Sequence, residues 1–153
     1  MSANQEPGGR FEVRVTSDSH FGWLRTRMAL ERTLMAWLRT AVALIGFGFT
    51  IVQFFQRLNQ MEGVAPAARP EAPRQLGLAL IGAGILALII SAQQYRRMVR
   101  YLWSDPYRPI AGIDGKSMDP IITQTPLLGI VVVMILIGLF AFGAVLLLSL
   151  IHI

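Results

Sequence analysis

Apolar and polar residues follow one another along this chain in long blocks. Three apolar stretches, over residues 41–55, 76–95 and 127–151, are separated by two segments rich in proline. Long apolar runs without charges are typical of helices that cross a membrane. We therefore expect an all-α integral membrane protein with three transmembrane helices, over about residues 20–55, 76–95 and 127–151.

The first predicted helix has an amphipathic N-terminal half. Its apolar residues there are separated by arginines at positions 25, 32 and 39. The apolar run that follows, residues 41–55, has 15 residues, whereas a span needs about 20 at 1.5 Å each. The span must therefore begin near Met35, and this places Arg39 inside the membrane boundary.

The remaining segments divide the chain into two parts. Residues 1–19 are polar and predict a flexible tail, with a short strand over residues 11–16 as the alternative. Ser17, Asp18 or Ser19 supplies the N-cap of the first helix in this prediction. Residues 20–153 then form one three-span transmembrane domain.

Small residues line one face of the second predicted helix. They are Gly77, Ala79, Gly82, Ala83, Gly84 and Ala87. Small side chains at four-residue spacing let helices approach closely in lipid. We expect this face and the first helix to form the contacts of an oligomer, with the third helix facing more lipid.

Composition agrees with a membrane protein and excludes several kinds of site. Hydrophobic residues make up 54% and charged residues 15%, against roughly 25% charged in soluble domains. The chain has no cysteine, which excludes disulfides and thiolate metal sites. No nucleotide-binding or nucleophile-elbow motif occurs, and no predicted span holds a carboxylate beyond Glu31 at the start of the first. We expect no enzyme activity, no proton-coupled transport, no metal or other cofactor, and no nucleic-acid partner.

The net charge is +5, and the distribution of basic residues predicts the orientation. The N-terminal flank carries six basic residues, the first loop three, the second loop five and the C-terminal tail none. Basic flanks face the cytoplasm, so the N-terminus is expected inside and the C-terminus on the opposite side. The two histidines then lie on opposite sides and cannot share a metal. The aromatic residues Trp23, Trp37, Tyr95, Tyr101 and Trp103 fit an interfacial belt on the cytoplasmic side.

Arg25, Arg32 and Arg39 recur every seven residues, and Gly46 and Gln53 continue the series. Seven-residue steps return to nearly the same face of a helix, about 10 Å further along the axis. We call these five positions the arginine stripe. An arginine within hydrocarbon costs at least about 2.5 kcal/mol, so the stripe should face a protein interior or water. Repeated around the axis of a homo-oligomer, it would form arginine rings suited to an anion path.

Other interpretations of these arginines stay open. The stripe could bind lipid phosphates, with Arg39 snorkelling to the headgroups, or it could dock a partner protein. Glu31 could pair with Arg27 four residues earlier. Arg96, Arg97 and Arg100 directly follow the second span; they either set the topology or extend a basic vestibule formed by Arg25 and Arg32. Arginine binds two phosphate oxygens at once, which fits both lipid phosphate and a translocated phosphate.

The segment Ala-Leu-Glu-Arg-Thr-Leu-Met-Ala-Trp-Leu-Arg-Thr at residues 29–40 resembles a known family. It is similar to the signature Ala-Asn-Glu-Arg-Thr-x-Leu-Ala-Trp-x-Arg-Thr of the domain of unknown function 202 family. Leu30 and Met35 depart from this signature. The matching residues are Glu31, Arg32, Thr33, Ala36, Trp37, Arg39 and Thr40. The family includes YidH-like bacterial inner-membrane proteins and the membrane part of the vacuolar transporter chaperone polyphosphate polymerase.

This resemblance implies a three-span fold over about residues 24–151 and a bacterial inner-membrane location. In the polymerase, five such units enclose a polyphosphate channel with basic residues at its mouth. Arg25 and Arg32 match a lysine and an arginine there, and Arg96 with Arg97 resembles a basic pair after the second span. This chain departs from the polymerase in two ways. The polymerase pattern has no arginine at the position of Arg39, whereas the bacterial pattern has one. This chain also has no synthesising domain.

The arginine stripe predicts a homo-oligomer with an anion channel, and the resemblance implies three to five subunits and a polyphosphate-type channel. Its pore-lining or anion-binding residues would be the arginine stripe with Arg96 and Arg97. Glu31, Thr33, Trp37 and Thr40 are expected to serve structure or assembly. The alternative is a non-catalytic scaffold or accessory subunit that docks a partner or binds anionic lipid.

Overall fold

A computed structural model describes residues 13–61, 71–111 and 126–151, with side chains to residue 147. Its three long helices are α1 (Ser17–Asn59), α2 (Ala72–Leu102) and α4 (Pro126–Ile151), and a short 3₁₀ helix, η1, covers Arg108–Ala111. The described residues include no strand. All three long helices are long and apolar enough to cross a membrane, which confirms the predicted fold class. The predicted tail lies mostly outside the described residues.

Helix α1 begins three residues earlier than predicted, and Thr16 is its N-cap. The Thr16 hydroxyl accepts a hydrogen bond from the Ser19 backbone N–H at 3.2 Å, and the Ser19 hydroxyl oxygen accepts one from the Thr16 N–H at 2.9 Å. This reciprocal pair satisfies two N–H groups that a helix start leaves unpaired. With 43 residues, α1 is about 64 Å long, twice the hydrocarbon thickness of a bilayer.

Helix α2 extends beyond both predicted ends. It begins at Ala72 with Pro73 in its first turn, where a proline costs no hydrogen bond. It continues to Leu102 because residues 96–102 contain no glycine or proline and consist largely of good helix formers. The predicted second loop therefore began too early, and the three arginines after Tyr95 lie on a helix.

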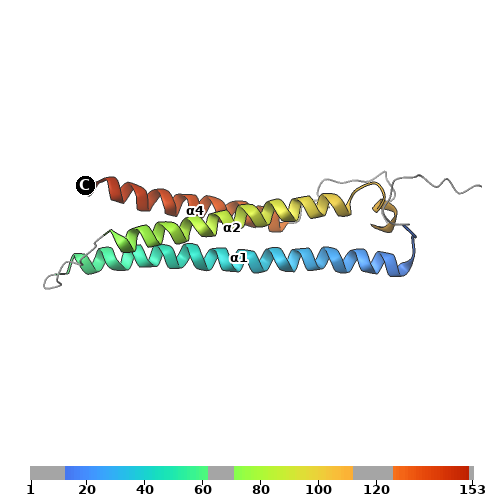
Figure 1. The fold of residues 1–153 in the computed structure, drawn as a ribbon, viewed down its shortest axis with the longest axis horizontal. Coiled ribbons are helices and arrows are strands. Elements are labelled where there is room, and N and C mark those ends of the chain that lie inside the picture. The colour runs from blue at the N-terminus through green and yellow to red at the C-terminus, as the bar shows by residue number, and fades with distance from the viewer. Residues whose placement is uncertain (1–12, 62–70, 112–125, 152–153) are drawn as a thin grey trace, which may run out of the picture.

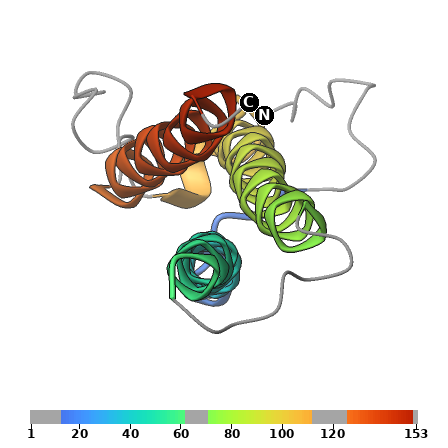
Figure 2. The ribbon, with the colours of Figure 1, turned by 90° about the vertical axis from the view of Figure 1, so that its left-hand side faces the viewer.

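The three helices form an elongated bundle in which α1 and α2 run antiparallel along most of its length (Figure 1). Helix α4 packs beside only the half of this pair that holds the α1–α2 connection. Viewed along the bundle, the helices occupy the corners of a triangle (Figure 2). The α1 and α2 ends that extend past α4, together with η1, are called the arginine-rich end below.

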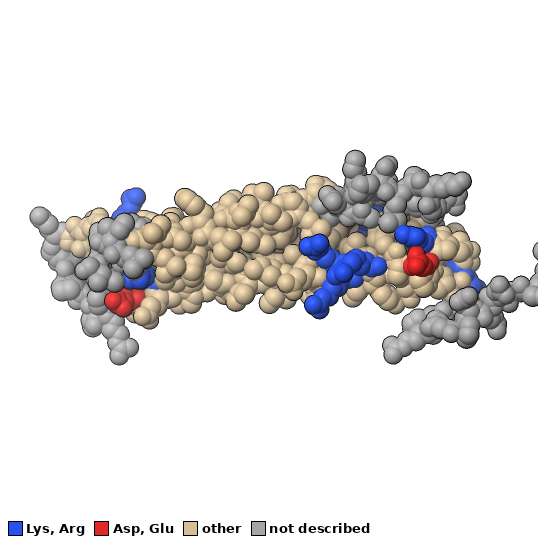
Figure 3. Space-filling view, turned by 90° about the horizontal axis from the view of Figure 1, so that it is seen from above, with Lys and Arg blue, Asp and Glu red and all other residues tan. Residues whose placement is uncertain are grey.

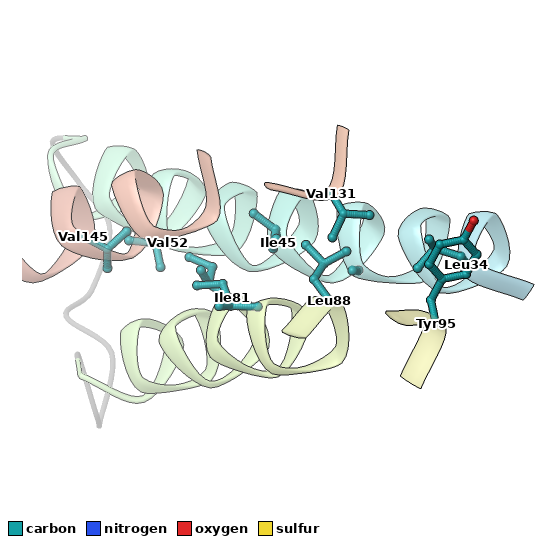
Figure 4. Packing of buried hydrophobic residues seen from close by; sticks show 10 residues of the cluster. Leu34, Ile45, Val52, Ile81, Leu88, Tyr95, Val131 and Val145 are labelled. Carbon is teal, nitrogen blue, oxygen red and sulfur yellow. The ribbon is translucent and has the colours of Figure 1, made fainter. Parts of the chain in front are cut away.

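One continuous apolar core joins the helices (Figure 4). Its largest fully buried side chains are Leu34 and Val52 of α1, Ile81 and Leu88 of α2, and Val131 and Val145 of α4. The alignment follows from close contacts: Gly84 lies against Ala41 and Ile45, and Gly77 lies against Gly48 and Val52. Leu34 accordingly lies beside Tyr95.

The same contacts set the relative height of residues on different helices. Since Leu34 is level with Tyr95 and the helices are antiparallel, Arg32 is level with Arg97. Gly138 of α4 lies against Ile45, and Figure 1 shows α4 parallel to α1. Pro126, twelve residues before Gly138, is therefore level with Thr33.

Part of the small-residue face of α2 is used within the chain. Gly77 and Gly84 are buried against α1, and Gly82 faces Phe142 of α4. The expectation that this whole face contacts another copy is therefore wrong for these glycines, because the chain's own helices already cover them. Ala79 and Ala83 remain exposed.

Candidate functional site: the arginine stripe and the arginine-rich end

The arginine stripe lies on the face of α1 that points away from the rest of the chain. The residues of α1 that are buried against α2 are Leu34, Ala41, Ile45, Gly48 and Val52. Arg39 precedes Ala41 by two positions, so it lies about 160° around the helix from it. Arg25, Arg32 and Arg39 are all exposed. A Cβ added at Gly46 would meet nothing within 4 Å.

Arg39 lies well within the apolar part of the bundle. Thr33 is level with the first residue of α4, and Arg39 is six residues deeper, or about 9 Å along the axis. Its neighbours Met35 and Val42 are apolar and 44% and 41% exposed. The chain therefore displays a guanidinium on its outer surface among apolar side chains.

The deeper end of the stripe is less charged and less open. Gly46 and Gln53 follow Arg39 at steps of about 10 Å, and Gln53 is half-buried. The stripe thus passes from exposed arginines at one end of α1 to an open glycine and a glutamine amide near the other.

Glu31 is paired within its own helix. Its carboxylate Oε1 lies 3.9 Å from Arg27 Nε, so the predicted Arg27–Glu31 pair is confirmed. The Arg27 guanidinium also lies 5.8 Å from the centre of the Trp23 ring, a cation–π distance. Glu31 is therefore an ion-pair partner of Arg27 in the single chain.

The other motif residues divide into hydrogen-bonded threonines and an exposed tryptophan. The hydroxyls of Thr33 and Thr40 donate to the carbonyls of Ala29 and Ala36, at 2.9 and 3.2 Å. These bonds within one turn satisfy each hydroxyl without a second helix. Trp37 is 46% exposed, so its ring is available to lipid or to another chain.

Arg96 and Arg97 are level with the stripe but lie on another side of the bundle. Tyr95 is buried against α1, and Arg97, two positions on, lies about 160° around α2. Both arginines are exposed. Figure 3 shows a band of basic side chains on this face, next to a broad uncharged belt. One chain therefore does not join Arg32 with Arg97 into a single site; a common vestibule needs more than one copy.

The arginine-rich end contains a small packed cluster that sequence reasoning missed. His20 Nδ1 lies 2.7 Å from the Ile110 carbonyl oxygen, and Trp23 Nε1 donates to the Leu102 carbonyl at 3.1 Å. Trp23 also meets the Trp103 ring edge-to-face, with ring centres 5.4 Å apart. We call Trp23, Leu102, Trp103, Ile110 and Ala111 the aromatic cap.

The aromatic cap corrects part of the predicted interfacial belt. Trp23 is only 7% exposed in this cluster, and Tyr95 is 5% exposed in the main core, so neither ring faces headgroups as predicted. The high density of aromatic residues at 101–107 is the one sequence signal for this cluster. It does not reveal that Trp23 and His20 bind carbonyls that lie 79 and 90 residues further along the chain.

Two tyrosines complete this end. The hydroxyls of Tyr101 and Tyr107 are 2.9 Å apart, and this hydrogen bond raises the pKa of Tyr107. Tyr107 therefore stays neutral at physiological pH and adds no negative charge beside the arginines. Among the described residues, no three His, Cys, Asp or Glu side chains gather into a metal site.

A family model described as a domain of unknown function (DUF202) matches residues 25–101, half of the chain. The protein belongs to the DUF202 family. Comparison with curated proteins gave no match, and neither did comparison with solved structures.

The DUF202 match covers the stripe and α2 but not the whole described fold. It begins at Arg25 and ends at Tyr101, so it includes the motif segment, Arg96 and Arg97. All five residues of the aromatic cap and all of α4 lie outside it. The arginine stripe and Arg96 with Arg97 thus lie within the matched region, whereas the aromatic cap and η1 lie outside it.

Proposed function

We propose that this DUF202 protein forms a homo-oligomer in which the arginine stripe lines a path for anions. One observation carries the proposal: Arg39 is exposed about 9 Å inside the apolar part of the bundle, on a face of α1 that no other described helix covers. A guanidinium facing hydrocarbon costs at least about 2.5 kcal/mol. Facing a shared aqueous axis removes most of this cost.

Symmetry turns the stripe into a set of rings. Copies arranged with α1 towards a common axis place Arg25, Arg32 and Arg39 in three rings about 10 Å apart. Gly46 and Gln53 continue the path with a small residue and a neutral amide. Three to five subunits is the range that the resemblance implies.

The chemistry of the rings favours phosphate-bearing anions. A guanidinium presents a planar fork that fits two oxygens of a phosphate. Arg96 and Arg97 are level with Arg32, so in an assembly they add positive charge around the same mouth. Long-range attraction by such a ring raises the local concentration of anions. We propose that the protein lies in a bacterial inner membrane with this end facing the cytoplasm, since basic flanks of transmembrane helices face the cytoplasm.

A second candidate rests on the length and flexibility of the Arg39 side chain. An arginine side chain can bend back towards headgroups from one or two turns inside. The stripe would then bind anionic lipid, or dock a membrane partner for which this protein is a non-catalytic scaffold.

The test uses purified protein in liposomes, with anion efflux and oligomer mass measured on the same samples. The variants are Arg39→Ala, Glu31→Ala and, as a control, Arg57→Ala, which removes an exposed arginine at the opposite end of α1. The channel predicts that Arg39→Ala lowers anion selectivity about tenfold or more, because a ring of like charge concentrates anions by at least that factor. The oligomer should persist, because alanine brings no charge into the lipid. Arg57→Ala should change little.

The other outcomes separate the alternatives. Loss of the oligomer in both Arg39→Ala and Glu31→Ala would show that Arg39 joins subunits through a neighbouring Glu31. Unchanged flux and unchanged assembly in Arg39→Ala would refute the channel and favour lipid binding. A monomer in nanodiscs would refute the shared axis.

A further inference from the structure

An open cleft lies between α1 and α2 near the arginine-rich end. Its volume is about 110 Å³. It is lined from α1 by Leu30, Thr33, Leu34 and Trp37, and from α2 by Ser91, Gln94, Tyr95 and Met98. Trp37 and Met98 are 46% and 49% exposed, so the cleft opens onto the surface of the bundle.

The cleft is separate from the arginine stripe. Trp37 precedes Arg39 by two positions, so the two side chains lie about 160° apart around α1. No lining residue comes from α4. The cleft therefore opens on a third side of the bundle, and its occupant does not depend on what the stripe faces.

Its height places it at the edge of the apolar part of the bundle. The α1 residues of the cleft, Leu30 to Trp37, cover about 10 Å of the helix axis. The first residue of α4 is level with Thr33, in the middle of this stretch. The deeper half thus lies at the height of acyl chains, and the outer half at the height of lipid headgroups.

The lining matches the upper part of a lipid. The walls are mostly apolar, and the Ser91 hydroxyl at the base is satisfied by the Leu88 carbonyl at 3.0 Å. The Thr33 hydroxyl likewise donates to a carbonyl of its own helix, so neither hydroxyl needs a polar ligand as a hydrogen-bond acceptor. An apolar cavity of about 150 Å³ holds one benzene, which makes 110 Å³ suitable for a few carbons of an acyl chain.

Positive charge stands beside the outer rim. Gln94 lines the cleft, and Arg97 follows three positions later on α2, so the two side chains are neighbours on the helix surface. Arg97 is exposed. A guanidinium at headgroup height favours a phosphate with net negative charge.

We propose that this cleft binds one anionic phospholipid, with the upper part of an acyl chain beside Trp37 and the headgroup phosphate on Arg97 at the outer rim. The lipid would come from the leaflet at the arginine-rich end. It would fill a gap that the α1–α2 contact leaves open, and so support that contact where α4 no longer covers it.

The experiment measures quenching of Trp37 fluorescence by brominated lipids in vesicles. The full-length protein is reconstituted with brominated phosphatidylglycerol or brominated phosphatidylcholine in a background of unbrominated lipid. The signal of Trp37 is the difference between the natural protein and Trp37→Phe, since Trp23 and Trp103 pack in the aromatic cap. The ratio of the two quenching curves gives the preference for the anionic lipid.

We expect a preference of roughly fivefold for phosphatidylglycerol, the effect of one basic residue facing an anionic lipid. Arg97→Gln should abolish it. Thr33→Phe should also abolish it by filling the cleft, whereas Thr40→Phe should not. Thr40 is the matched control, since it makes the same hydroxyl bond on the same helix but does not line the cleft. Circular dichroism checks that each variant keeps its helices.

Equal quenching of Trp37 by both lipids in the natural protein would overturn the proposal. So would a preference for the anionic lipid that survives both Arg97→Gln and Thr33→Phe. A third contradicting result would be no quenching of Trp37 in the natural protein together with a changed oligomer mass in Thr33→Phe. The last result would mean that a second copy fills the cleft. Arg39→Ala should leave the preference intact, so failure of the anion path and failure of this site are distinguishable.

Discussion

Gly48 of α1 and Gly77 of α2 form a reciprocal contact. A Cβ built on either glycine would lie 2.7 Å from the carbonyl oxygen of the other. A Cβ atom essentially never lies within 3.0 Å of a non-bonded backbone oxygen, so a side chain at either position would force the two backbones to move apart. This contact fixes how closely the two helices approach and how they align along the bundle.

Gly77→Ala should therefore destabilise the bundle. The added methyl group meets backbone, which cannot move aside as a flexible side chain can, and overpacking of this kind costs about 1–3 kcal/mol. Gly46→Ala is the control, because nothing lies within 4 Å of a Cβ there and alanine favours the helix by roughly 1 kcal/mol. In detergent micelles, the melting temperature of Gly46→Ala should be higher than that of the natural protein, and the melting temperature of Gly77→Ala should be lower. Equal melting of the two variants would contradict the contact.

The aromatic cap should depend on the Trp23 indole N–H. Trp23→Phe keeps a ring but removes the hydrogen bond to the Leu102 carbonyl, a bond worth about 0.5–1.5 kcal/mol at this part-buried site. We expect faster proteolysis near η1 in Trp23→Phe and no change in Trp37→Phe, whose ring is exposed. The same proteolysis rate in both variants would show that the cap is not held by this bond.

The proposed orientation can be tested because the chain has no cysteine. Single cysteines at Met61, after α1, and at Asp105, after α2, lie on exposed positions at opposite ends of the bundle. An impermeant thiol reagent applied to intact cells should label Met61→Cys but reach Asp105→Cys only after permeabilisation. Labelling in the reverse pattern would invert the topology.

The fold was predictable because each span has a strong local signal. The apolar runs, and the shortfall of the run after Arg39, are properties of consecutive residues. The ends of α2 were harder to predict, since Pro73 lies in its first turn and residues 96–102 continue the helix into a region of mixed polarity. A proline nearby indicates a boundary only to within a few residues.

The contacts between helices were harder to predict for a physical reason. The glycines at 77 and 84 were recognised as a packing face, but a pattern on one helix does not say whether its partner is in the same chain or in another copy. The aromatic cap joins Trp23 to a carbonyl 79 residues away, and no local pattern encodes that distance. Such partners depend on the alignment of α1 with α2, which Gly48 and Gly77 set.

The central claim is that Arg39 faces water inside the apolar span, and the reaction of a thiol at that position tests it most directly. Cysteine reacts as the thiolate, which needs an aqueous surrounding, and its short side chain cannot bend back to the headgroups. The protein in liposomes is treated with an anionic, impermeant thiosulfonate. Arg32→Cys serves as the exposed reference, and Val133→Cys on α4 as an exposed apolar position at nearly the same depth. We predict that Arg39→Cys reacts within about tenfold of the rate of Arg32→Cys and far faster than Val133→Cys. A rate for Arg39→Cys as low as that of Val133→Cys would contradict the anion path.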